Sequence, residues 1–122
     1  MRYLLMHRLD ESRPEAWNPS PEFIARMGAF IEEIAKAGVL ITADGVLPSA
    51  KGALVRRSAG QRTVTDGPFT EAKEVIGGFA LLQVADKAEA VAWASRFADL
   101  FDEVEVEVRQ VAEMSDIEGA AG

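Results

Sequence analysis

The spacing of apolar residues along the chain predicts alternating strands and helices. Over 103–109, valines and charged residues alternate strictly, which is the period of a half-buried strand. The segment 2–8 is apolar on both alternating faces near its start, which predicts a central strand covered on both sides. Residues 78–84 and the short run 39–41 are apolar stretches of strand length.

Two further segments carry the spacing of three and four that is typical of amphipathic helices. The first begins at Ser20-Pro21-Glu22, where a hydroxyl cap, a proline and an acid favour a helix start, and it ends at Gly38. The second begins at Asp86, with Glu89 placed to complete a capping box. The apolar stripes consist of Phe23, Met27, Phe30, Ile31 and Ile34 in the first helix, and of Ala90, Trp93, Phe97 and Leu100 in the second.

A β-hairpin is expected between these elements. Residues 52–57 and 61–65 flank Ser58-Ala59-Gly60, which suits a turn. The order β-α-β-(β-hairpin)-β-α-β predicts an α+β fold on the split βαβ plan, with an antiparallel sheet and both helices on one of its faces. Apolar residues then remain on the other face. A second copy of the chain is the simplest cover, so we expect a homodimer.

Length and charge narrow the classes of function. A chain of 122 residues with 48% hydrophobic positions suits one domain, placed at 1–113, followed by a flexible acidic tail at 114–122. The net charge of -7 argues against partners such as nucleic acid or an anionic membrane. No run approaches the roughly 20 apolar residues of a membrane span, and the N-terminus lacks the pattern of a signal peptide, so a cytoplasmic location is expected. The absence of cysteine excludes disulfides and cysteine-ligated metals, and we predict no metal site and no cofactor.

One stretch carries a family resemblance. The run 65–79, with Asp66-Gly67-Pro68-Phe69 near its head and Gly77-Gly78-Phe79 at its end, resembles the signature of the DGPF branch of the YCII-related family. Residues 36–40, 45–49 and 106–109 resemble the same family's pattern, and the resemblance covers about 1–113.

The resemblance implies a ferredoxin-like fold that dimerises through its sheets into an α/β barrel. That architecture serves several unrelated chemistries, so it does not fix a reaction. Members of this branch often sit beside extracytoplasmic-function sigma factors, which implies a regulatory or stress-response setting. Better-studied relatives are thought to use a histidine–aspartate pair in lyase- or dehalogenase-like chemistry. The single histidine here, His7, has no surrounding motif that matches that pair.

The signature run supplies the candidate site residues. Asp66 is a candidate general base or substrate-orienting carboxylate at a pocket mouth, and His7 is a candidate partner in acid–base catalysis. Gly67, Pro68 and Phe69 are candidate ligand-binding residues. The same residue types also explain a plain turn, with Asp66 accepting backbone N–H bonds, glycine supplying positive φ and Phe69 filling the loop, so both interpretations stay open.

Two basic residues are candidates for holding an anionic ligand, namely Lys73 and Arg56. The alternative for Lys73, with its neighbours Glu71 and Glu74, is a solvated charged loop. Three functions therefore remain in view: a dimeric module that binds a small molecule and acts in regulation, a small-molecule enzyme that uses Asp66, and a structural interaction module. The first is preferred, because the sequence lacks a convincing catalytic pair.

Overall fold

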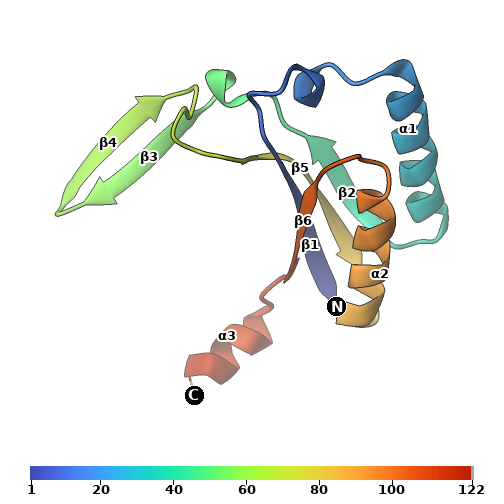
Figure 1. Ribbon diagram of the computed structural model, residues 1–122. Helices are drawn as coiled ribbons and strands as arrows, with labels where there is room; N and C mark the ends of the chain where they lie inside the picture. Colours follow the sequence, from blue (N-terminus) through green and yellow to red (C-terminus); the bar gives the residue numbers. More distant parts are fainter. Residues whose placement is uncertain (122) are drawn as a thin grey trace.

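The computed structural model describes residues 1–121 and shows a four-stranded antiparallel sheet, with two helices on one face and a separate two-stranded hairpin (Figure 1). This arrangement confirms the α+β class expected from the sequence. In order across the sheet the strands are β2 (Leu40–Gly45), β5 (Val75–Gln83), β1 (Arg2–Leu9) and β6 (Glu105–Gln110).

The two long helices lie side by side on the same face of the sheet (Figure 1). Each begins at the predicted cap: the Ser20 hydroxyl accepts a hydrogen bond from the Phe23 N–H at 3.1 Å, and the Asp86 carboxylate accepts one from the Glu89 N–H at 2.9 Å. Gly38 follows the first helix with φ +76°, the left-handed conformation of a helix-ending glycine. The helical segments are η1 (Pro14–Trp17), α1 (Pro21–Lys36), η2 (Ser49–Lys51), α2 (Lys87–Ala98) and α3 (Met114–Ala121).

The core lies between this helical layer and the sheet. Tyr3 and Leu5 point from β1 towards the helices, and Leu82 of β5 is fully buried beside them. Removing these apolar side chains from water supplies the main driving force for folding. The buried set consists of Tyr3, Leu5, Phe30, Ile34, Val39, Leu82, Val84, Ala90 and Ala94.

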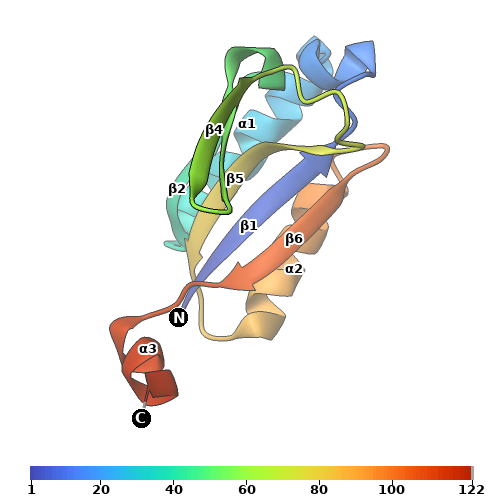
Figure 2. The same ribbon diagram turned by 90° about the vertical axis from the view of Figure 1, so that its left-hand side faces the viewer.

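The opposite face of the sheet carries no helix of the α1–α2 layer and is turned towards the viewer in Figure 2. Leu4 and Met6 alternate with the core residues of β1 and therefore lie on this face. The β1–β5 register places Leu81 opposite Leu4 and Phe79 opposite Met6. These four half-buried apolar side chains, Leu4, Met6, Phe79 and Leu81, form what we call the open-face stripe.

The predicted hairpin consists of β3 (Ala53–Ser58) and β4 (Gln61–Asp66). Its turn residues Ala59 and Gly60 both have positive φ, +51° and +78°, as a two-residue turn matched to the strand twist requires. Every residue of both strands is exposed, and the hairpin projects from the side of the sheet that faces away from α1 and α2 (Figures 1 and 2).

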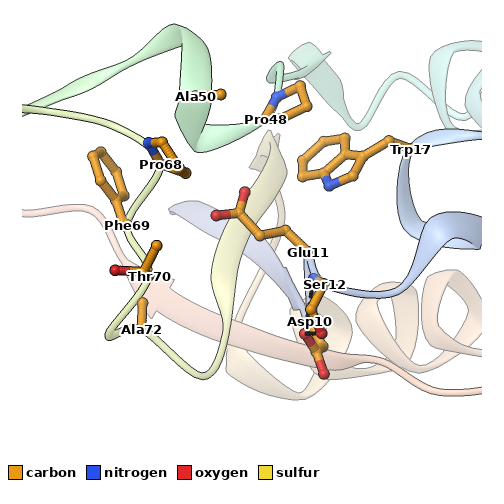
Figure 3. A pocket seen from close by; sticks show the side chains of 10 residues that line it. All are labelled: Asp10, Glu11, Ser12, Trp17, Pro48, Ala50, Pro68, Phe69, Thr70 and Ala72. Atoms are coloured by element: carbon orange, nitrogen blue, oxygen red, sulfur yellow. Dashed lines mark hydrogen bonds between the residues drawn. The ribbon is translucent and has the colours of Figure 1, made fainter.

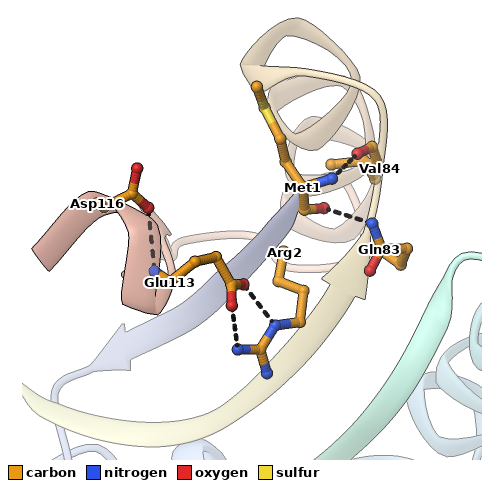
Figure 4. Close-up of polar contacts among 6 residues, drawn as sticks. All are labelled: Met1, Arg2, Gln83, Val84, Glu113 and Asp116. Carbon is orange, nitrogen blue, oxygen red and sulfur yellow. Dashed lines mark hydrogen bonds and ion pairs between the residues drawn. The ribbon is translucent and has the colours of Figure 1, made fainter. Parts of the chain in front are cut away.

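Helix α3 forms where the sequence predicts no regular element. The Arg2 guanidinium donates two hydrogen bonds to the Glu113 carboxylate, at 2.8 and 3.1 Å, and Asp116 accepts a hydrogen bond from the Glu113 N–H at 3.0 Å (Figure 4). The local sequence pattern does not indicate this ion pair, because its two residues lie far apart in the chain. The flexibility expected for 114–122 stays a prediction, and residue 122 lies outside the described residues. Within residues 1–121 no helix is long and apolar enough to cross a bilayer.

Candidate functional site

The loop that follows β4 packs closely against the turn η2. The Gly67 N–H donates to the Gly52 carbonyl at 2.9 Å. A Cβ built on Gly67 would lie only 1.7 Å from the Ser49 carbonyl oxygen, so no side chain fits at this position. The expectation that Gly67 supplies a positive φ is wrong, because within residues 1–121 the glycines with positive φ are Gly38 and Gly60. Close approach of two backbones is the reason instead.

Ser49 connects this loop to the segment after β1. Its backbone N–H donates to the Glu11 carboxylate at 3.0 Å, and its hydroxyl donates to the same carboxylate. The same Ser49 Oγ accepts a hydrogen bond from the Phe69 N–H at 2.8 Å. Ser49 is only 7% exposed, and its three partly buried hydrogen bonds tie three loops together.

A hollow of about 390 Å³ lies above this network (Figure 3). Trp17 and Phe69 stand on opposite sides of it, with the Glu11 carboxylate between them. Pro48 and Pro68 add apolar surface, while Asp10, Ser12 and Thr70 add polar atoms. Its volume falls within the range of small-molecule sites, and its lining combines apolar walls with a few polar groups.

Two polar groups at this hollow set its electrostatics. The pKa of Asp10 is lowered below its usual value by hydrogen bonds from the Ser12 hydroxyl, at 2.6 Å, and from the Ser12 N–H, at 2.9 Å, and by the positive charge of Arg13. Asp10 is therefore a carboxylate at neutral pH. The Trp17 Nε1 is buried and has no hydrogen-bond partner among the described residues.

A second, more open groove of about 710 Å³ adjoins the first and shares Pro48, Phe69 and Ala72 with it. It runs between the root of the hairpin and the start of β5. Its lining is mainly apolar and includes Val46, Leu47, Leu54, Val75 and Ile76. Among the described residues, no group of three or more histidine, aspartate or glutamate side chains is placed to hold a metal ion.

Comparison with known proteins identifies the family. The model of the YCII-related domain matches residues 1–115. The chain belongs to the YCII-related family. It is also 33% identical over 96 residues to an uncharacterised protein of Rhizobium meliloti, an alignment that covers 77% of each chain.

The sequence-predicted residues of this YCII-related protein fall into separate places. Pro68 and Phe69 line the hollow, and Gly67 forms the close approach beneath it. Asp66 is the exposed last residue of β4, paired with Ala53. Lys73 and Arg56 are also exposed, and neither lines the hollow. The binding and catalytic roles assigned to these residues stay predictions.

His7 lies on the helix-facing side of β1. Its ring centroid is 5.4 Å from that of Phe97 and 5.5 Å from that of Phe101. The backbone of Gly77 and Gly78 closes against the imidazole, since a Cβ on either glycine would come within 2.8 Å of it. Within residues 1–121 no hydrogen bond or ring contact connects His7 with Asp66. The two candidates for acid–base catalysis therefore have different surroundings in the single chain.

Two residues at the centre of this site are missing from the sequence-based candidates, namely Glu11 and Ser49. Glu11 sits in a polar loop in which nothing in the sequence distinguishes it from its neighbours. Ser49 ends the 45–49 run that carries the family resemblance. The resemblance therefore marked this position, but the neighbouring residues did not indicate its role. The structure also identifies Trp17 as a wall of the hollow.

The burial of His7 predicts a specific pH dependence of stability. Desolvation between the aromatic rings lowers its pKa below the usual value of 6.5, so the folded protein favours the neutral imidazole. Above pH 6.5 both states are neutral and the stabilisation is fully present; as the pH falls through 6.5 towards the lower folded pKa, the unfolded chain takes up a proton first and stability is lost. In urea unfolding at pH 7.5 and pH 5.5, the His7→Phe variant is therefore expected to lose less stability than wild type. An equal loss of stability between pH 7.5 and pH 5.5 in both proteins would contradict the attribution of this pH dependence to His7.

Proposed function

We propose that this YCII-related protein is a dimeric module that binds a small molecule in the hollow between Trp17 and Phe69. The observation that carries the proposal is the Glu11–Ser49–Phe69 network, which holds the loops around an open hollow in place. A site whose walls are fixed before binding loses little conformational entropy when a ligand enters. The network therefore favours recognition of a ligand over a loop that merely fills space.

The chemistry of the hollow narrows the ligand class. Asp10 and Glu11 make the site unfavourable for anions, so the ligand is neutral or cationic. Trp17 and Phe69 present ring surfaces that suit a flat apolar body or a cationic group.

The proposal extends to the assembly. The strand order β2-β5-β1-β6 with both long helices on one face agrees with a ferredoxin-like unit, and the Asp66–Phe69 run agrees with the DGPF branch. The open-face stripe of Leu4, Met6, Phe79 and Leu81 gives two copies an apolar surface through which the sheets pack face to face into a barrel. A cytoplasmic role in regulation linked to sigma-factor signalling is the setting we propose on the family resemblance.

A nuclear magnetic resonance screen tests ligand binding directly. The chain has two tryptophans, so its spectrum should contain two indole N–H signals, assigned with a Trp17→Phe variant. When neutral and cationic aromatic fragments are added, we expect binders to shift the Trp17 indole signal and the Phe69 and Thr70 amides, and to leave the Trp93 indole in the core unchanged. The same fragments should lose at least about tenfold in affinity for Phe69→Ala.

Anionic fragments of the same shape serve as the matched control and should not bind. A screen in which no fragment shifts the Trp17 indole, or in which Phe69→Ala binds every fragment as tightly as wild type, would remove the proposed site.

A further inference from the structure

Two elements of this chain project from the open-face side of the sheet with little to hold them. One is the β3–β4 hairpin, which we call the arm, and the other is helix α3 (Figures 1 and 2). A two-stranded hairpin without a third strand or a helix against it is at best marginally stable in water. An eight-residue helix such as α3 is likewise too short to be stable alone. Both elements therefore call for a partner surface.

The arm offers one face that is both apolar and basic. Val55 and Val64 are register partners, 68% and 63% exposed, and the next pair on the same face is Arg57 and Arg62. Like charges directly opposite one another destabilise a strand pair. Within residues 1–121 neither arginine has an ion-pair partner, and the one acid on this face of the arm, Asp66, lies two register pairs away.

The other face of the arm is turned to its own chain. Leu54 is 44% exposed and lines the groove at the root of the hairpin together with Val75 and Ile76. Arg56 and Thr63 share the side of the hairpin that carries Leu54. The valine–arginine face is therefore the one available to a second molecule.

Helix α3 has the complementary composition. Met114 and Ile117, three positions apart, lie on one side of the helix and are 68% and 54% exposed. Asp116 and Glu118 supply negative charge, and the described helix contains no basic residue. Glu118, four positions after Met114, lies beside this apolar pair, whereas Asp116 lies towards the opposite side of the helix and accepts the Glu113 N–H. An apolar pair with an acid beside it on α3 thus matches an apolar pair with arginines beside it on the arm.

The positions of the two elements prevent this match within one chain. The arm is rooted near the end of β1, where Ser49 is bonded to Glu11. Helix α3 is attached at the start of β1, through the Arg2–Glu113 ion pair (Figure 4). A two-fold axis that lies between two face-to-face sheets and runs across the strands exchanges these ends. In such a dimer the arm of each copy reaches α3 of the other.

We propose that the arm of each protomer packs against α3 of a second copy of this chain, with Val55 and Val64 against Met114 and Ile117, and Arg57 and Arg62 beside Glu118. This contact rests on the proposed dimer and adds an exchanged arm to it. The interface is isologous, so the same contact forms twice and encloses the open-face stripes between the two arms.

Disulfide trapping tests the contact in a background that has no cysteine of its own. Full-length protein with Val64→Cys and Ile117→Cys is expected to form a covalent dimer under mild oxidation, visible on a non-reducing gel. The matched control is Thr63→Cys with Ile117→Cys, which moves one cysteine to the other face of the arm. Absence of the covalent dimer, or an equal yield from the control, would overturn the proposal.

Charge reversal supplies a second readout by analytical ultracentrifugation. Arg57→Glu with Arg62→Glu is expected to raise the dimer dissociation constant at least about tenfold, and adding Glu118→Lys should restore part of the affinity. Reversal of Lys51 and Arg56, which lie off the contact face, should change it less than about threefold.

A sheet-face variant separates this contact from the dimer itself. Leu81→Asp, in the open-face stripe, should dissociate the dimer whether or not the arm is exchanged. A wild-type protein that is monomeric would overturn both the proposed dimer and the exchanged arm. A wild-type dimer that Leu81→Asp dissociates but that ignores the reversals at Arg57 and Arg62 would overturn the exchanged arm alone.

Discussion

Replacing Gly67 with alanine is expected to destabilise the fold by roughly 3 kcal/mol or more, which lowers the melting temperature by about 10 °C or more. The added methyl group would sit 1.7 Å from the Ser49 carbonyl oxygen and 2.5 Å from its carbon. Both are backbone atoms, and the Gly52 N–H donates to the same Ser49 oxygen at 2.9 Å, so the obstacle cannot rotate away. Relief requires that the whole loop separate from η2, which also breaks the Phe69–Ser49 hydrogen bond.

Gly28→Ala is the matched control. Gly28 lies inside α1, and a Cβ there would meet nothing within 4 Å. The same substitution should therefore stabilise the protein, by about 0.5–1 kcal/mol, because alanine favours the helix. Thermal unfolding by circular dichroism, with both variants at one protein concentration, compares them. A Gly67→Ala protein that melts with wild type would show that the close approach at Ser49 is not rigid.

The different outcomes for these two glycines illustrate what sequence patterns can and cannot predict. Helix caps such as Ser20 and Asp86 are local, since the cap and the N–H that it accepts are three residues apart, and both were predicted correctly. The hairpin turn at Ala59-Gly60 is local in the same sense. Gly67 was recognised as important, but its reason is a contact with a residue eighteen positions earlier in the chain, so the sequence could not supply it.

The candidate site depends still more on contacts between distant segments. The Ser49 side chain joins Glu11, 38 positions away, to Phe69, 20 positions away. None of the three has a local pattern that indicates a hydrogen-bond network. Ser49 lies in the run 45–49 and Phe69 in the run 65–79, and both runs carry the family resemblance. Only the fold shows that these two runs lie against each other. The long-range Arg2–Glu113 ion pair at α3 was missed for the same reason.

The signature residues divide their roles within this arrangement. Gly67 allows the loop to touch η2, Phe69 gives its N–H to Ser49 and its ring to the hollow, and Pro68 adds wall surface. Asp66 ends β4 at an exposed position. In the single chain, the structure thus supports a role for Gly67, Pro68 and Phe69 in shaping the loop and the hollow. The role of Asp66 depends on what lies against the arm in the assembly.

Ser49→Ala is expected to destabilise the protein by about 2 kcal/mol, because it removes the hydroxyl that joins Glu11 to Phe69 in a buried position. The Phe69 N–H then loses its acceptor and Glu11 keeps only the Ser49 backbone donor. Ser95→Ala is the matched control, since that exposed hydroxyl donates to the Val91 carbonyl of its own helix at 2.8 Å. Its loss should change the free energy of unfolding by less than about 0.5 kcal/mol.

A double-mutant cycle separates a connected network from independent hydrogen bonds. If Glu11 and Ser49 act as a unit, the combined Glu11→Ala and Ser49→Ala variant should be more stable than the sum of the single effects predicts, with a coupling free energy of about 1 kcal/mol or more. Glu11→Ala combined with Ser95→Ala should be additive, because these residues share no partner. The same variants can also be compared by their affinity for the fragments, which connects stability to binding. If the network fixes the shape of the hollow, Ser49→Ala should weaken binding, although Ser49 does not itself line the hollow. Additive stabilities with unchanged binding would mean that the hollow keeps its shape without this network.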